Sequence, residues 1–441
     1  MKRVNRHQIV LIAWPIILSN LSTPLLGIVD TAVIGNLGNP ALIGAIAIGS
    51  IIFSFVYWGF GFLRMGTTGL VAQAFGASNS TEASAAFYRA ALLGIILGFM
   101  ILAFQYPLAV LSFELFSGSQ EVESNARIYF DIRIWTAPIS LCHLAIIGFL
   151  LGQQDTRSVL LIQLVLNGTN IALDLLFVTG FSWSVSGVAW ATVISEVLAF
   201  SLGIFIISSR LERKISITDL FNFEKLRIML AVNRDIMVRT LCLIFAFAWF
   251  TNKGAQFGDI TLAANAILMQ LVTFSAFFLD GFALTAETLV GAAVGERNKE
   301  KLDTTIRLCT QLGLGTAIML SLLYWFTGTW FISLMSNVDS VRLEAGEYLI
   351  WVILAPVLSV WCYLLDGIFI GATRTVEMRN AMIISLISFL GAWYLSDLIL
   401  WQAAKNHGLW VSLLIYFIIR ALALNYYLPR LRRLESYGGK S

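Results

Sequence analysis

Long apolar runs separated by short polar segments dominate this 441-residue chain. Each run holds about 20 residues or more, the length that a helix needs to cross the hydrocarbon core of a bilayer. The pattern predicts an all-α polytopic membrane protein. Its twelve expected spans cover residues 9–34, 41–75, 85–111, 126–152, 157–179, 187–208, 227–252, 259–294, 304–332, 344–371, 379–400 and 408–429. We interpret the first run as a membrane span because it is too long for the apolar region of a signal peptide.

The composition excludes several classes of protein. Hydrophobic residues make up 58% of the chain and charged residues only 12%, about half the share of a soluble domain. The net charge of +3 is too small for a nucleic-acid binder. The sequence carries neither HExxH, GxSxG nor a Walker A motif, so we expect neither an enzyme nor direct ATP coupling, and no cofactor or metal site. The four cysteines form no CxxC pair.

The distribution of Lys and Arg predicts the orientation in the membrane. Twenty of them lie at the termini or near the even-numbered loops, against four near the odd-numbered loops, Arg127, Lys253, Arg342 and Lys405. Cytoplasmic loops are enriched in basic residues. We therefore expect an integral inner-membrane protein with both termini in the cytoplasm.

An internal repeat relates the two halves of the chain. Residues 69–79 align with residues 288–298 at a shift of 219, and Ala137-Pro138 aligns with Ala355-Pro356 at a shift of 218. Six helices per repeat predict two lobes related by a quasi-twofold axis along the membrane normal. This layout is typical of alternating-access transporters.

The predicted boundaries follow the longest charged loop between the spans. We expect an N-terminal lobe over residues 1–213, a cytoplasmic linker over residues 214–225 and a C-terminal lobe over residues 226–441. A duplicated scaffold without transport activity, or a channel, is the alternative interpretation.

The first expected span combines an ionisable group with a helix-bending residue. Asp30 follows Pro24 by six residues. Proline removes one backbone hydrogen bond, so Pro24 is a candidate hinge. A carboxylate at membrane depth is a functional candidate by default. Alternatively, Asp30 marks the outer end of the helix.

A polar face on the fifth span provides further candidates. Asn167, Asn170 and Asp174 are spaced by three and four residues, which places them on one side of a helix. Thr192 in the sixth span could complete a site with them. If Asp30 approaches Asp174, the two carboxylates would share a proton. A purely structural hydrogen-bond cluster is the alternative.

The second half lacks this pair of carboxylates. At shifts of 218 to 220, both Asp30 and Asp174 fall on Ala or aromatic residues, so a proton site of this kind is expected in the first lobe only. Asp366 in the tenth span is a possible second-lobe site. It could attract a cation, or it could pair with a neighbouring arginine.

These residues and several longer motifs carry a resemblance to a known family. Residues 24–35, 62–76, 233–237 and 361–374 together resemble the multidrug and toxic compound extrusion (MATE) family, in its DinF-type branch. The resemblance implies a twelve-helix antiporter that exports cationic or amphipathic drug-like compounds in exchange for protons. It also implies a proton and substrate site at Asp30, Asn170, Asp174 and Thr192, with bending of the first helix at Pro24 linked to protonation.

Several properties stay open at this stage. The coupling ion is expected to be H⁺, with Na⁺ as an alternative. The expected partners are small drug-like molecules and the lipid bilayer, with no nucleic acid and a monomeric state. A flippase for lipids or lipid-linked sugars is the second candidate function.

Overall fold

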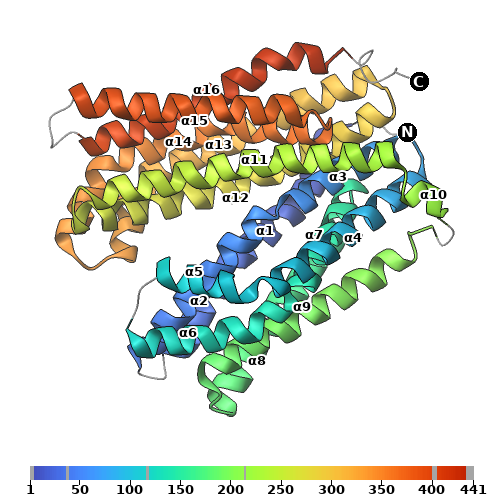
Figure 1. The fold of residues 1–441 in the computed structure, drawn as a ribbon. Helices are drawn as coiled ribbons and strands as arrows, with labels where there is room; N and C mark the ends of the chain where they lie inside the picture. The colour runs from blue at the N-terminus through green and yellow to red at the C-terminus, as the bar shows by residue number, and fades with distance from the viewer. Residues whose placement is uncertain (1–3, 36–38, 116–118, 213–214, 400–404, 434–441) are drawn as a thin grey trace. The chain divides into compact units, whose positions relative to one another are not determined.

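The computed structural model describes residues 4–35, 39–115, 119–212, 215–399 and 405–433. Throughout these ranges the regular structure is helical (Figure 1). The first half contains α1 (Arg6–Gly35), α2 (Pro40–Gly59), α3 (Phe62–Gly76), α4 (Ser80–Ala103), α5 (Gln105–Leu115), α6 (Gln120–Arg133), η1 (Ile134–Thr136), α7 (Ala137–Gly152), α8 (Thr156–Asp174), η2 (Leu175–Gly180), α9 (Ser184–Ser208) and α10 (Ile217–Leu220). The second half contains α11 (Phe223–Ala255), α12 (Asp259–Gly295), α13 (Lys299–Met335), α14 (Asp339–Gly371), α15 (Thr375–Ile399) and α16 (Lys405–Leu431).

These helices confirm the predicted fold class. Ten helical stretches among the described residues are long and apolar enough to cross a membrane, and three of them join consecutive elements, as α2 and α3 do. The remaining long helices, α1 and α11, have 30 and 33 residues and are therefore about 45 to 50 Å long. With these two, the helices correspond one to one with the twelve predicted spans.

Some predicted spans are interrupted. The third expected span is divided at Phe104, between α4 and α5. The fourth is divided by the 3₁₀ turn η1, after which Pro138 lies in the first turn of α7. Proline is tolerated there because the N–H that it lacks would have no partner within the helix. A hydropathy average over a whole span does not detect such breaks, although polar residues such as Gln105 and Arg133 lie beside them.

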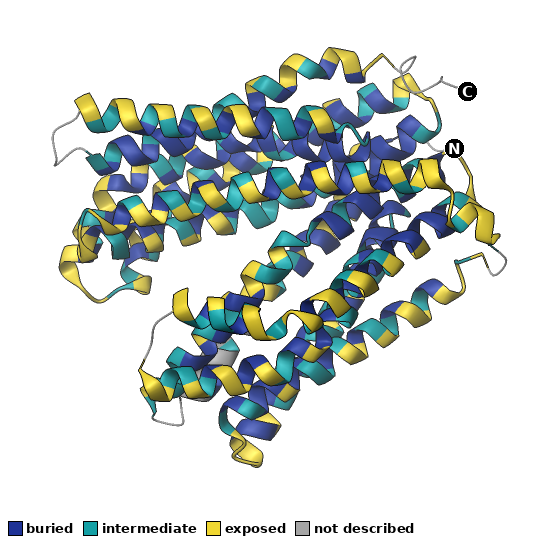
Figure 2. Cartoon of the chain, viewed as in Figure 1, coloured by how far each residue is buried: buried dark blue, intermediate teal, exposed yellow. Residues whose placement is uncertain are grey.

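The chain divides into two compact units. The first unit comprises residues 18–229, and the second comprises the residues up to Ile17 together with Leu230 onward. Both units expose many large apolar side chains along their helices (Figure 2), including those of Phe205, Phe326 and Leu398, at 76%, 78% and 84% exposed. Apolar exposure on this scale would be unfavourable in water and is expected of helices that face lipid.

The two units repeat the same close helix contact. In the first unit, a Cβ atom at Gly148 would lie 2.6 Å from the carbonyl oxygen of Arg64, so α7 can approach α3 only with glycine there. In the second unit, Gly367 lies equally tightly against the carbonyl group of Ala283, which brings α14 against α12. Both residues of the second contact lie 219 positions after those of the first. Small residues of this kind let membrane helices pack closely.

The turns after these helices repeat as well. Ser78 and Arg297 both have a positive φ, of 56° and 53°, and so do Gln154 and Thr373, at 63° and 53°. Each pair is again separated by 219 residues. The residue after Ser78 and the residue after Arg297 is an asparagine whose side chain caps the following helix. Local geometry therefore supports the internal repeat inferred from the sequence.

Candidate functional site

The polar face of α8 is buried in the first unit. Asn167, Asn170 and Asp174 are 4%, 1% and 0% exposed. Asp174 is the last residue of α8, and the helix then widens into the π-helical turn η2. π-Helical turns within α-helices are frequently found at functional sites. The face that the sequence predicted to be polar therefore points into protein and ends at a change in helical pitch.

Three of the predicted site residues meet in one hydrogen-bond network. The orientation of the Asn170 amide is assigned from its hydrogen-bond partners, which place its nitrogen toward Asp174. In this orientation Nδ2 donates to Asp174 Oδ2 at 2.9 Å, and Oδ1 accepts from Thr192 Oγ1 and from Thr192 N at 3.2 and 3.1 Å. Asn170 thus links the carboxylate at the end of α8 to α9.

A second contact links the same face of α8 to α1. Asn167 Nδ2 donates to Ser22 Oγ at 2.7 Å, and Ser22 Oγ donates to the carbonyl oxygen of Ser19 at 2.7 Å. Pro24 lies two residues further along α1, within the helix. The α1 backbone also carries Asp30, but the Asp30 side chain lies outside the described part of the structure. A hydrogen bond therefore joins α1 to the polar face of α8 two residues before Pro24.

A partly buried ion pair also lies in the first unit. Arg133 Nη2 of α6 lies 3.5 Å from Glu196 Oε1 of α9, and Ser140 Oγ of α7 donates to Glu196 Oε2 at 2.6 Å. The Arg133 guanidinium donates to Tyr129 Oη at 2.8 Å, and its carbon lies 4.7 Å from the centre of the Phe53 ring. Carboxylate and aromatic groups thus surround one cation at membrane depth.

The sequence analysis did not identify Glu196. The available signal was its position four residues after Thr192, which places both side chains on one face of α9. The pairing of α6 with α9 depends on tertiary structure, and helical periodicity does not report it.

In the second unit, Asp366 is held by two arginines. Arg239 Nε of α11 donates to Asp366 Oδ2 at 2.8 Å, and Arg420 Nε of α16 donates to Asp366 Oδ1 at 3.2 Å. Further ion-pair contacts join each guanidinium to the same carboxylate. Asp366 is 4% exposed. Of the two interpretations left open for Asp366, pairing with arginine is the one that the structure contains.

The position equivalent to the α8 network is apolar in the second unit. Residues 219 positions after Asn170 and Asp174 are Phe389 and Trp393, on α15, which are 0% and 3% exposed. The Trp393 ring packs against that of Phe257 at 5.9 Å between centres. The two halves therefore share a backbone repeat but fill this position with different chemistry.

Comparison with known sequences points to one family. The profile of the MatE family matches residues 15–176 and 236–394. The DNA damage-inducible protein F of Escherichia coli strain K12 is 39% identical over 420 residues, which cover 94% of this chain and 90% of that protein.

Comparison with solved structures gives the same fold. A transporter of the MOP superfamily from Pyrococcus furiosus has a TM-score of 0.87 at 20% identity, over 98% of this chain and 96% of that chain. A multidrug resistance MATE family transporter in an outward-facing conformation also has a TM-score of 0.87 at 20% identity, over 98% and 97% of the two chains.

Proposed function

The chain belongs to the MatE family, whose members are membrane transporters, and on that premise we propose that it exports cationic or amphipathic drug-like compounds in exchange for protons. The proposed mechanism is alternating access between two six-helix lobes, residues 1–213 and 226–441, joined by the linker 214–225. The proposed driving force is inward proton flow, since one charge crossing 100 mV contributes about 2.3 kcal/mol.

One observation carries the proposal. Asp174 is fully buried at membrane depth, and the neutral amide of Asn170 is one of its hydrogen-bond partners. A buried carboxylate in such surroundings is costly in its charged form and is a candidate for reversible protonation. We therefore propose Asp174, together with Asp30, as the proton-binding carboxylates of the first lobe.

The arrangement around α1 supports a route from protonation to movement. An ionised Asp174 accepts a hydrogen bond from Asn170, and a protonated one can also donate. Such a change would alter the network on the α8 face to which Ser22 is bonded through Asn167. We propose that α1 responds by bending at Pro24 and that substrate is released outward.

Asp366 is less suited to this role. Two guanidinium groups already donate hydrogen bonds to its carboxylate. We accordingly assign coupling to the first lobe.

The excess of Lys and Arg at the termini and in the even-numbered loops favours cytoplasmic termini in an inner-membrane protein. We propose that the protein acts as a monomer.

Transport by purified protein in liposomes tests the proposal. A fluorescent cationic drug would be followed under an imposed pH gradient without Na⁺, for wild type, Asp30→Asn, Asp174→Asn and the control Asp131→Asn. Asp131 is an exposed carboxylate of the first unit, 4.0 Å from Arg127. We expect gradient-driven transport in wild type and the control and its loss in the other two variants.

Each other outcome has a defined meaning. If transport requires a Na⁺ gradient, the coupling ion is Na⁺ and not the proton. An Asp174→Asn variant that transports normally would remove Asp174 from the mechanism. If wild type moves no drug under either gradient, drug export is wrong, and lipid flipping becomes the function to test.

A further inference from the structure

An apolar groove runs along the second unit, outside the candidate site. It lies between α13 and α16 with α14 as its floor, and encloses about 530 Å³. Its walls are almost entirely apolar, with Leu364, Leu365 and Ile368 from α14 and Ala421 and Leu422 from α16. The α14 residues are buried by at least nine-tenths, whereas Leu422 is 59% exposed. The groove is therefore open along one side.

The groove ends at a cationic cluster. Arg432 lines the groove and also two further hollows that share lining residues with it. The charged residues around these hollows are four cations and two anions, Lys299, Arg307, Arg432, Arg433, Glu300 and Asp303. Arg432 Nε lies 3.4 Å from Asp303 Oδ1, with both side chains more than 40% exposed. The mouth of the groove thus carries an excess of two positive charges.

The length of the groove matches one leaflet of a bilayer. Its lining follows α16 from Ile418 to Leu428 and ends at Arg432, directly after the helix, fourteen residue steps or about 21 Å from Ile418. Half of a bilayer with its headgroups is about 20 to 22 Å thick. An apolar groove of this length matches an extended phospholipid, and the basic residues at its end are complementary in charge to an anionic headgroup.

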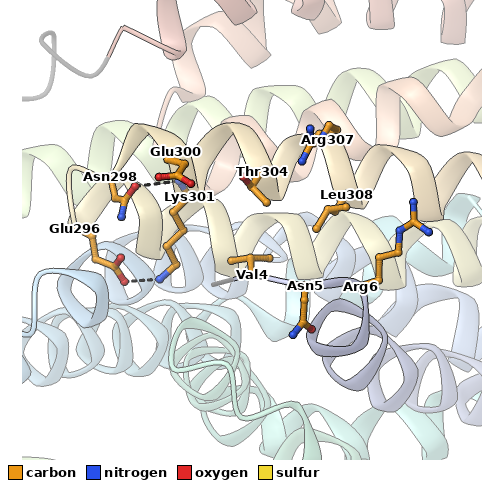
Figure 3. Close-up of a pocket in the computed structure, with 10 residues that line it drawn as sticks. All are labelled: Val4, Asn5, Arg6, Glu296, Asn298, Glu300, Lys301, Thr304, Arg307 and Leu308. Atoms are coloured by element: carbon orange, nitrogen blue, oxygen red, sulfur yellow. Dashed lines mark hydrogen bonds and ion pairs between the residues drawn. The ribbon is translucent and has the colours of Figure 1, made fainter. Parts of the chain in front are cut away.

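A neighbouring hollow of the same unit lacks an apolar floor. It lies beside Val4, Asn5 and Arg6 at the turn between α12 and α13 (Figure 3). Its lining has three cations and two anions, and the Lys301 ammonium group is paired with Glu296. Because most of its lining residues are polar or charged, that hollow does not fit an acyl chain.

We propose that the groove between α13 and α16 binds one anionic glycerophospholipid. An acyl chain would lie on α14, and the phosphate headgroup would contact Arg432. Basic pockets between membrane helices at the cytoplasmic side recognise anionic headgroups by this chemistry. The leaflet is the one on the side of the chain termini. The proposal does not depend on the transport activity proposed above, since it rests only on groove shape and charge.

Lipid retention by the full-length protein in detergent tests this proposal. Native mass spectrometry would compare phosphatidylglycerol with phosphatidylcholine of identical acyl chains. We expect wild type to retain phosphatidylglycerol preferentially. Arg432→Gln should lower that preference about fivefold, as removal of one basic contact near the membrane surface predicts. Asp303→Asn removes a negative charge beside the headgroup and should raise the preference.

Arg430→Gln is the matched control. Arg430 lies one half-turn from Arg432, and its guanidinium is placed over the rings of Tyr426 and Tyr427, at 5.9 and 5.8 Å, rather than in the groove lining. The Arg430→Gln variant should retain both lipids as wild type does.

Equal retention of the two lipids by wild type, or an equal loss in Arg430→Gln and Arg432→Gln, would overturn the proposal. So would tighter binding of the lipophilic cation tetraphenylphosphonium at Arg432, which would make the groove a drug site. Because no transport is measured, neither result bears on proton coupling.

Discussion

Asn167 on α8 and Ser22 on α1 share a 2.7 Å hydrogen bond, two residues before Pro24 of α1. Asn167 also accepts from Gln163 Nε2 at 3.2 Å, so its amide is held from both sides. Asn170 and Asp174 lie on the same face of α8, so the contact with the first helix and the buried carboxylate lie along one polar face. This connection leads to the first prediction.

Ser22→Ala should weaken transport more than stability. Ser22 Oγ takes part in two hydrogen bonds, and the loss of each costs about 0.5 to 1.5 kcal/mol of unfolding free energy, whereas the proposed signal from α8 to α1 would lose its contact. Ser201→Ala is the control, because Ser201 Oγ donates only to the carbonyl oxygen of Val197 in its own helix. Thermal unfolding and liposome transport would be measured together. Equal transport by the two variants would contradict a role for the contact with Asn167.

Gly148→Ala should destabilise the first unit. The added methyl group would lie 2.6 Å from the carbonyl oxygen of Arg64, and overpacking of this kind costs about 1 to 3 kcal/mol. Gly168→Ala is the matched control in α8, where no atom lies within 4 Å of the added group. That substitution should stabilise the helix by up to about 1 kcal/mol. Thermal unfolding in detergent measures both, and similar shifts would contradict the close contact of α7 with α3.

Asp366→Asn should be among the most destabilising single changes in the second unit. It leaves Arg239 and Arg420 buried without their carboxylate, and breaking a buried pair in this way costs about 3 to 5 kcal/mol. Asp303→Asn breaks an exposed pair and should cost at most about 1 kcal/mol. If the two variants unfold at the same temperature, Asp366 does not neutralise the arginines as the geometry indicates.

Asp155 should make the turn between α7 and α8 sensitive to acid. Burial alone would raise the pKa of its carboxyl, but hydrogen bonds from Ser158 and the guanidinium of Arg210 at 2.6 Å together hold that pKa below its ordinary value of 3.8. A lowered folded-state pKa contributes stability above pH 3.8, and this contribution is lost as the pH falls through the lowered value.

Asp155→Asn isolates this effect, because asparagine caps a helix as well as aspartate does. We expect wild type to unfold at a higher temperature than the variant at pH 7, and the difference to shrink below pH 3.8. Arg210→Gln should reduce the same difference at pH 7. A gap that widens on acidification would show that the charge of Asp155 opposes folding.

The sequence predicted the spans well because hydropathy is a local property. Each of the twelve apolar runs corresponds to a helix or a pair of helices. The division of the third span at Phe104 was not predicted, although Gln105 and Pro107 directly after it are a sequence signal for a break. The repeat was detected from short matches, and the structure extends it to positive-φ residues that carry unrelated side chains, such as Gln154 and Thr373.

The candidate site could be predicted only where its residues share a helix. Asn170 and Asp174 are four residues apart on α8, so periodicity places them on one face, and α9 contributes Thr192. The pair of Arg133 and Glu196 joins helices that are distant in sequence, and a single sequence contains no signal for that contact. For Asp366 the sequence showed a buried charge but not which of its alternatives would hold.

The turns that follow α3 and α12 have a wider meaning. Ser78 has a small neutral side chain and Arg297 a long cationic one, yet both residues have the same left-handed backbone conformation at equivalent positions of the two halves. The two halves therefore share the backbone conformation of the duplicated ancestor, whereas their side chains have diverged. A protein built in this way can acquire or lose a charged group in one half without redesign of the other. Functional asymmetry is then the natural result of gene duplication on a tolerant scaffold.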